Sequence, residues 1–204
     1  MSYKTKQLNC RKLSSKLPNM TYVLSSRCSD GVVIIADRKH TIDKAEDSVY
    51  DNKIFGEFSG IITSFSGIRG NYELFLLYLL DYINKNRSMN HNEFLLKAIE
   101  IAQKLKRNDY EVLFGISSTV TNNLSLLKHM YPDGRIESIR AYVVIGHGEP
   151  VGRYFLKKHW KENLTMEQVA ELGYFIIKVI EKYNLEESVG LGNTDDIFQK
   201  KPQI

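Results

Sequence analysis

The chain has 204 residues, of which 43% are apolar, and a formal net charge of +4 at pH 7. This length predicts one globular domain, large enough to bury most of the surface that its unfolded form exposes. No apolar run approaches the ~20 residues that cross a bilayer, which argues against a transmembrane protein. Cys10 and Cys28 predict reduced thiols rather than a disulfide, and we expect a cytoplasmic protein that needs no metal or cofactor.

The positive charge is concentrated at the N-terminus. Residues 1–20 contain no acidic residue and five of the 28 basic ones, Lys4, Lys6, Arg11, Lys12 and Lys16. The remainder is close to neutral, so the charge does not predict a nucleic-acid partner. Residues 1–20 also lack periodicity, and predict a basic leader that is a propeptide, a disordered arm or a transit peptide. We favour a propeptide or dispensable arm, followed by the folded domain over residues 21–204.

The stretch from Thr21 to Asp37 predicts a hairpin. Residues 21–28 alternate apolar and polar side chains, as a half-buried strand does, and residues 31–37 are nearly all apolar. Ser29-Asp30-Gly31 between them is typical of a turn. Because the two strands of a hairpin lie side by side, Asp37 at the end of the second strand should lie next to Thr21. A hydroxyl and a carboxylate are then neighbours.

Two more candidate site residues follow the hairpin. Lys53 lies in a strand-like run expected over residues 49–55, and Ser66-Gly67 closes a strand expected over residues 60–66. A nucleophilic hydroxyl, a carboxylate, an ammonium group and a glycine amide at a strand-to-helix turn are the groups that acyl transfer requires.

The later elements alternate in blocks of helices and strands. Apolar residues at spacings of three and four predict helices, and Thr165 with Gln168 forms a capping box for the last one. The expected helices cover residues 69–85, 92–106, 151–160 and 165–183, and the expected strands cover residues 110–118, 122–130, 141–145 and 195–200. Separate blocks of strands and helix pairs favour an α+β fold. We expect a four-layer αββα sandwich, in which two antiparallel sheets lie between helix pairs.

These residues resemble the proteasome β-type subunits of the N-terminal-nucleophile hydrolases. The similarity rests on Gly31-Val-Val-Ile-Ile-Ala-Asp-Arg38, Asn52-Lys-Ile54 and Ser64-Phe-Ser-Gly67, and on the second glycine turn in Tyr142-Val-Val-Ile-Gly-His-Gly-Glu-Pro150. Thr21, Asp37, Lys53 and Gly67 have the spacing of the family without a gap. The similarity extends over nearly all of residues 21–199.

The resemblance implies a role for each of these residues. Thr21 would be the nucleophile of a threonine endopeptidase once its own α-amine is free to act as the base. Lys53 would keep that amine unprotonated, Asp37 would hold the lysine, and the Gly67 amide would donate to the oxyanion. Two further positions imply contacts with a peptide or unfolded-protein substrate: Thr41 would bind its backbone, and Phe65 would line the first specificity pocket.

The chain departs from the pattern of the family at three positions. Met20 stands where self-cleaving members have glycine, His147 replaces a serine of the second glycine turn, and Glu187 replaces a supporting aspartate. Met20 could itself be the initiator methionine, whose removal would free Thr21 without proteolysis. Two other functions stay open, a non-catalytic ring subunit and a stand-alone amidohydrolase or transpeptidase. The family also implies assembly into rings, either as a homo-oligomer or with other proteasome-like subunits.

Overall fold

The computed structural model of the chain describes residues 21–41, 48–50, 52–58, 60–86, 89–106, 109–117, 125–186 and 189–191. The predicted leader over residues 1–20 and the predicted last strand over residues 195–200 lie outside the described residues. Among the described residues, no helix combines the length and the apolarity that spanning a membrane requires.

Thr21 and Asp37 belong to a three-stranded antiparallel sheet with the order β10-β1-β2. The predicted hairpin forms its centre, because β1 (Tyr22–Cys28) pairs with β2 (Gly31–Ala36) from Val23 opposite Ala36 to Cys28 opposite Gly31. The other edge of β1 pairs with β10 (Tyr142–Gly146), in which Gly146 lies opposite Tyr22. Thr21 therefore lies at the start of the central strand, between Asp37 and Gly146.

The second main sheet has five antiparallel strands in the order β5-β6-β7-β8-β9. Its strands are β5 (Ile54–Phe58), β6 (Ile61–Gly67), β7 (Tyr110–Ile116), β8 (Leu126–Met130) and β9 (Ile136–Ile139). A separate two-stranded sheet joins β3 (Lys39–Thr41) to β4 (Ser48–Tyr50). The expected strand over residues 49–55 is therefore wrong as one element, since Lys53 lies between β4 and β5, two strands of different sheets.

The helices follow the predicted ranges closely. They are α1 (Arg69–Lys85), α2 (His91–Leu105), α4 (Glu149–His159) and α5 (Met166–Lys182). The Thr165 capping box of α5 is confirmed, because the threonine hydroxyl accepts from the Gln168 amide and the glutamine side chain accepts from the Thr165 amide. In α4, Glu149 and Pro150 occupy the first turn, where an acid is favoured and proline costs no helical hydrogen bond.

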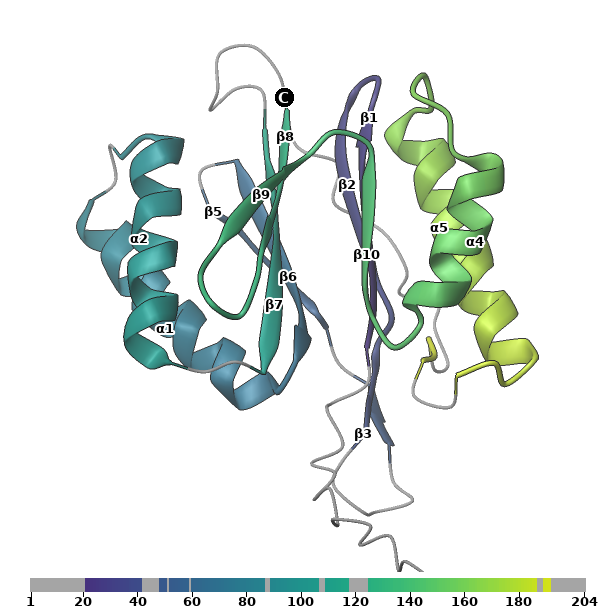
Figure 1. Cartoon of the computed structure of the whole chain (residues 1–204), viewed down its shortest axis with the longest axis horizontal. Coiled ribbons are helices and arrows are strands. Elements are labelled where there is room, and N and C mark those ends of the chain that lie inside the picture. The colour runs from purple at the N-terminus through teal and green to yellow at the C-terminus, as the bar shows by residue number, and fades with distance from the viewer. Residues whose placement is uncertain are drawn as a thin grey trace, which may run out of the picture.

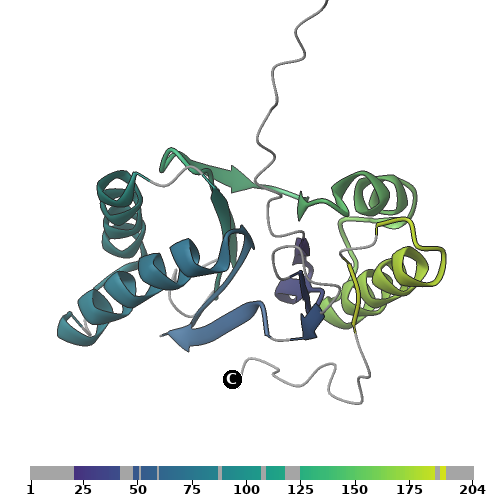
Figure 2. The ribbon, with the colours of Figure 1, turned by 90° about the horizontal axis from the view of Figure 1, so that it is seen from below.

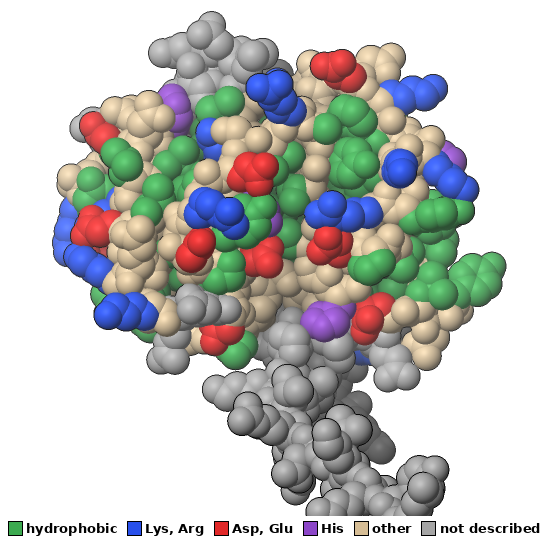
Figure 3. All heavy atoms as spheres, viewed as in Figure 1, with side chains coloured by type: hydrophobic (Ala, Val, Ile, Leu, Met, Phe, Trp, Pro, Cys, Tyr) green, Lys and Arg blue, Asp and Glu red, His purple; other side chains and the backbone are tan. Residues whose placement is uncertain are grey.

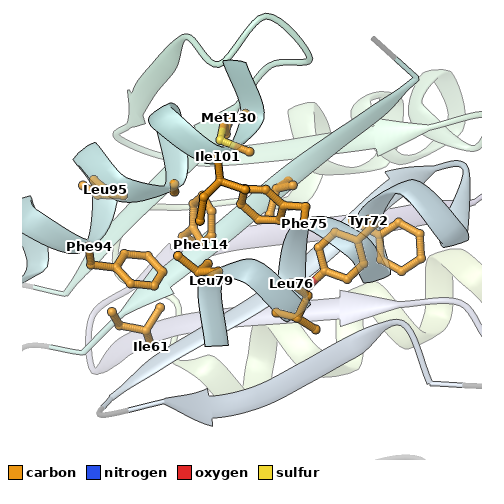
Figure 4. Close-up of a cluster of buried hydrophobic side chains, with 14 of the residues drawn as sticks. Ile61, Tyr72, Phe75, Leu76, Leu79, Phe94, Leu95, Ile101, Phe114 and Met130 are labelled. Atoms are coloured by element: carbon orange, nitrogen blue, oxygen red, sulfur yellow. The ribbon is translucent and has the colours of Figure 1, made fainter. Parts of the chain in front are cut away.

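The four layers are held by three hydrophobic clusters. One lies between α1, α2 and the five-stranded sheet and contains Phe75, Leu79 and Phe114 (Figure 4). The second joins α4 and α5 to the three-stranded sheet, and the third, which includes Val23 and Leu113, fills the space between the sheets. Figures 1 and 2 show the two sheets between the two helix pairs. The predicted α+β sandwich with αββα layers is confirmed.

Candidate active site

The start of β1 brings Thr21 against the end of β2. The Tyr22 amide donates to Asp37 Oδ1 at 2.8 Å, and the Asp37 amide donates to the Tyr22 carbonyl oxygen at 2.9 Å. Thr21 is only 1% exposed in the full chain, and its nitrogen forms the peptide bond to Met20. The hairpin thus places the carboxylate beside the threonine, as the turn predicted.

Lys53 forms a buried ion pair with Asp37. The distance from Lys53 Nζ to Asp37 Oδ1 is 2.7 Å, and both side chains are 0% exposed. Lys53 also donates to the Lys39 carbonyl oxygen, and its own carbonyl accepts from Ser64 Oγ at 2.7 Å. These contacts fix the lysine where the chain crosses from the β3–β4 sheet into β5. The sequence did not predict this hydrogen bond from Ser64. Ser64 and Phe65 are neighbours in β6, so their side chains lie on opposite faces of the sheet.

Burial shifts the ionisation of both members of this pair. Removal from water raises the pKa of the Asp37 carboxyl to about 6, and Lys53 beside it offsets only part of that increase. Burial also lowers the pKa of Lys53, while Asp37 acts in the opposite direction. Such a pair is stable only while both partners are present, since one buried charge without the other costs about 3–5 kcal/mol.

Two glycines with positive φ end strands of the two sheets. Gly67 ends β6 with φ +123°, and a Cβ atom there would lie 2.1 Å from the Asp109 carbonyl oxygen. Gly146 ends β10 with φ +92°, and its Cβ would lie 1.9 Å from the Thr21 carbonyl oxygen. Both positions exclude any larger residue, because each combines a left-handed backbone conformation with a close backbone neighbour. Gly146 was recognised in the sequence as part of a turn, but its contact with Thr21 spans 125 residues and has no local signal.

The residues expected to bind substrate lie in different surroundings. Thr41 ends β3, and its side chain lies outside the described part of the structure. Phe65 is 1% exposed on the face of β6 that packs against α1, where its ring stacks on Tyr72 with centroids 4.1 Å apart. Its role in a specificity pocket stays a prediction.

The auxiliary residues are not brought together by the described structure. His147 is exposed in the turn between β10 and α4, and Glu187 lies outside the described residues. Residues of the C-terminal part nevertheless reach the site, because the Gly190 carbonyl oxygen accepts from the amides of Arg38 and Lys39. No local feature of the sequence indicates that contact. Within the described ranges, no group of three His, Cys, Asp or Glu residues could hold a metal ion.

The sequence model of the proteasome subunit family matches residues 20–188, which is most of the chain and includes Thr21, Asp37, Lys53 and Gly67. The chain belongs to the proteasome subunit family. The resemblance to the β-type subunits is thereby supported, and subunits of this family generally form rings. A search of curated proteins finds no match.

The solved structures that resemble this proteasome-family chain include Anbu proteins. A "Gly-1" mutant of Anbu from Hyphomicrobium sp. strain MC1 has a TM-score of 0.71 at 16% identity, and the match covers 83% of this chain and 77% of that one. Anbu from Yersinia bercovieri, described as an ancestral β-subunit, has a TM-score of 0.70 at 16% identity and covers 84% and 78%. At this identity the likeness establishes the fold alone.

Proposed function

We propose that the chain is a proteasome β-like threonine endopeptidase whose nucleophile is Thr21, active once the peptide bond before Thr21 has been cut. The observation that carries this proposal is the buried Asp37–Lys53 ion pair beside the first residue of the central strand. A fully buried Lys–Asp pair contributes little net stability, because desolvation offsets the attraction between the charges. Its place beside a threonine, in a chain of the proteasome family, favours a catalytic role.

In the proposed reaction, the Thr21 hydroxyl oxygen attacks a peptide carbonyl and the α-amine of Thr21 accepts the hydroxyl proton. The Gly67 amide donates to the oxyanion of the tetrahedral intermediate, a contribution typically worth about 3–4 kcal/mol. The amine then passes the proton to the leaving nitrogen, which leaves an ester between the acyl half and Thr21, and water hydrolyses that ester. The ammonium of Lys53, held by Asp37, disfavours protonation of the amine.

A non-catalytic ring subunit is the second candidate. Two observations favour it: Met20 replaces the glycine of self-cleaving members, and Thr21 is 1% exposed in the full chain. Such a subunit would keep residues 1–20 and use the same fold only for assembly. Mass spectrometry of the N-terminus of the purified protein separates the two candidates, since the endopeptidase must begin at Thr21.

The proposal is tested by comparing the full-length chain with a chain that begins at Thr21, each assayed with internally quenched peptides and with a threonine-directed electrophile. We expect cleavage and labelling only in the chain that begins at Thr21. Thr21→Ala should abolish turnover, and Thr21→Ser should keep part of it because the hydroxyl and the amine both remain. Lys53→Ala should cost nearly as much as loss of the nucleophile, since groups that act as one unit are not additive.

Equal activity of the two chains would show that the free amine is not the base. Absence of activity from both, with fold and assembly intact, would favour the ring subunit.

A further inference from the structure

A cavity of about 380 Å³ lies beside the candidate site, between the edges of the two sheets. Its lining comes from strands β7, β8 and β9 on one side and from β10 and α4 on the other. Figure 1 shows β9 and β10 on the side of the molecule that faces the viewer, and Figure 3 shows acidic and basic side chains close together on the middle of that face.

The strand register connects this cavity to Thr21. Ser66 of β6 lies opposite Glu111 of β7, and both side chains are on the face of the sheet that is turned toward β1 and β10. Ser66 Oγ is 3.0 Å from the position of a Cβ on Gly146, the residue that touches the Thr21 carbonyl. Ser66 therefore links the cavity wall to the glycine turn at Thr21, because it pairs with Glu111 within its own sheet and lies against Gly146 of the other sheet.

The cavity lies on one particular side of Thr21. In the order β10-β1-β2, Asp37 follows β2 on one side of β1, and the cavity borders β10 on the other. The five-stranded sheet has the same arrangement. Lys53 precedes β5 at one edge of this sheet, and the cavity borders β7, β8 and β9 toward the other edge. In the proposed function, the substrate backbone binds at Thr41, beyond Asp37, and we assign this bound segment to the acyl half. The leaving half, which follows the scissile bond, then extends toward the cavity.

The cavity combines apolar walls with carboxylates. Each of its three glutamates has one partner: His129 Nε2 lies 2.8 Å from Glu111 Oε2, the Tyr131 hydroxyl donates to Glu137 at 2.8 Å, and Arg153 Nε donates to Glu149 at 2.6 Å. Arg135 stacks over the Tyr131 ring at 4.3 Å but does not line the cavity. The cavity is therefore lined by three carboxylates and one guanidinium, so acidic groups outnumber basic ones.

Two of these carboxylates converge on one place. Glu111 contacts the imidazole of His129, and Glu137 lies directly opposite His129 in the register of β8 and β9. His129 is 5% exposed, whereas the Glu111 side chain is 39% exposed and open to a ligand. A carboxylate accepts up to about four hydrogen bonds, so each keeps capacity for a further donor. Ile139 and Ile145 provide apolar contacts next to them.

We propose that this cavity binds the lysine or arginine side chain of the leaving half of a peptide substrate. The apolar stem would contact the isoleucines, and the charged group would lie between Glu111 and Glu137, as long cationic side chains commonly arrange themselves. The assignment of the leaving half rests on the proposed function of Thr21. Specificity at this site is thus directed at the residues after the scissile bond.

The test uses the chain that begins at Thr21 and three peptides with the same acyl half, which carry lysine, norleucine or glutamate after the scissile bond. Norleucine keeps the apolar stem of lysine and lacks its charge. We expect kcat/KM to be about tenfold higher for lysine than for norleucine, the effect of one charge-assisted hydrogen bond, and lowest for glutamate. The double variant Glu111→Gln, Glu137→Gln should remove this preference, and Glu162→Gln, a change at an exposed glutamate between α4 and α5, should keep it.

A binding measurement keeps the inference separate from turnover. Fluorescent peptides that represent the leaving half, with lysine or norleucine, are titrated into the Thr21→Ala chain and into the same chain with the two glutamine substitutions. Tighter binding of the lysine peptide than of the norleucine peptide, lost in the glutamine variant, supports the cavity site. If this result is obtained but no peptide is cleaved, only the proposed function fails. Cleavage without a lysine preference, or equal dissociation constants for the two peptides, would overturn the inference alone.

Discussion

The ionisation of Asp37 is the residue-scale property with the clearest functional consequence. Its pKa of about 6 lies above the ordinary value of 3.8, so the folded chain holds this proton over a pH range in which the unfolded chain has released it. Protonation of Asp37 therefore stabilises the folded state relative to the unfolded state. This stabilisation is fully present below pH 3.8 and is lost as the pH rises through about 6. The proposed reaction has the opposite requirement, because only the ionised carboxylate can hold the Lys53 ammonium.

We therefore expect the rate at which an electrophile labels Thr21, in the chain that begins at Thr21, to rise as the pH increases through about 6. The α-amine, with an ordinary pKa near 7.7–8, adds a second rise at higher pH. Labelling rates between pH 4.5 and 9 measure both steps. The control is Asp37→Asn, which should label more slowly and lack the lower step. A lower step that persists in this variant would assign it to another group.

At the scale of elements, the glycine turn at the end of β10 is where backbone geometry matters most. Gly146→Ala would place a methyl group 1.9 Å from the Thr21 carbonyl oxygen, in a backbone conformation that alanine rarely adopts. The strands must then separate, and we expect a loss of about 1–3 kcal/mol in the free energy of unfolding, measured by urea denaturation of the full-length chain.

Gly70→Ala is the matched control for this substitution. Gly70 lies in the first turn of α1, and a Cβ there would meet no heavy atom within 4 Å. Alanine should leave the stability unchanged or raise it by up to about 1 kcal/mol, because glycine is a poor helix former. Equal effects of the two substitutions would contradict the close contact at Gly146.

The elements themselves were largely predictable from the sequence. Helix α1 matches the expected range of residues 69–85, and α5 begins at the predicted capping box, because apolar periodicity and caps are local signals. The hairpin and its consequence for Asp37 are equally local. The break at Lys53 was missed because residues 49–55 read as one strand, whereas Tyr50 and Ile54 pair with different partners in different sheets.

The contacts that complete the site were less predictable. Gly146 with Thr21 and Gly190 with Arg38 join residues more than a hundred positions apart, and each contact depends on how the layers stack. The cavity at Glu111 and His129 had no sequence signal either, because an isolated glutamate or histidine in a strand is common on a solvated face. Its position next to Ser66 follows only from the register of β6 and β7.

At the scale of the whole molecule, α1 carries apolar side chains that neither sheet covers. Leu77 is 64% exposed, and Tyr78 is 55% exposed on the same helix. Subunits of the proteasome family generally form rings, and we propose that this surface contributes to such an assembly.

Leu77→Lys should therefore weaken self-association, because it places a charge where apolar surface would be buried. Sedimentation velocity at micromolar concentration should show the wild type as a large species and the variant shifted toward the monomer. Asn163→Lys adds the same charge at an exposed position between α4 and α5 and should leave the assembly intact. A wild-type monomer under these conditions would contradict assembly through α1.

The proposed nucleophile and the proposed oxyanion donor belong to different layers. Thr21 precedes β1 and Asp37 follows β2 in the three-stranded sheet, whereas Gly67 ends a strand of the five-stranded sheet. Their alignment is thus set by the stacking of the two sheets over the cluster that includes Val23 and Leu113. Under the proposed function, a small molecule that inserts into this interior and shifts one sheet against the other would inhibit peptide cleavage noncompetitively, although it never touches the threonine. Drug resistance to such a compound would arise by substitutions in the interior of the sandwich.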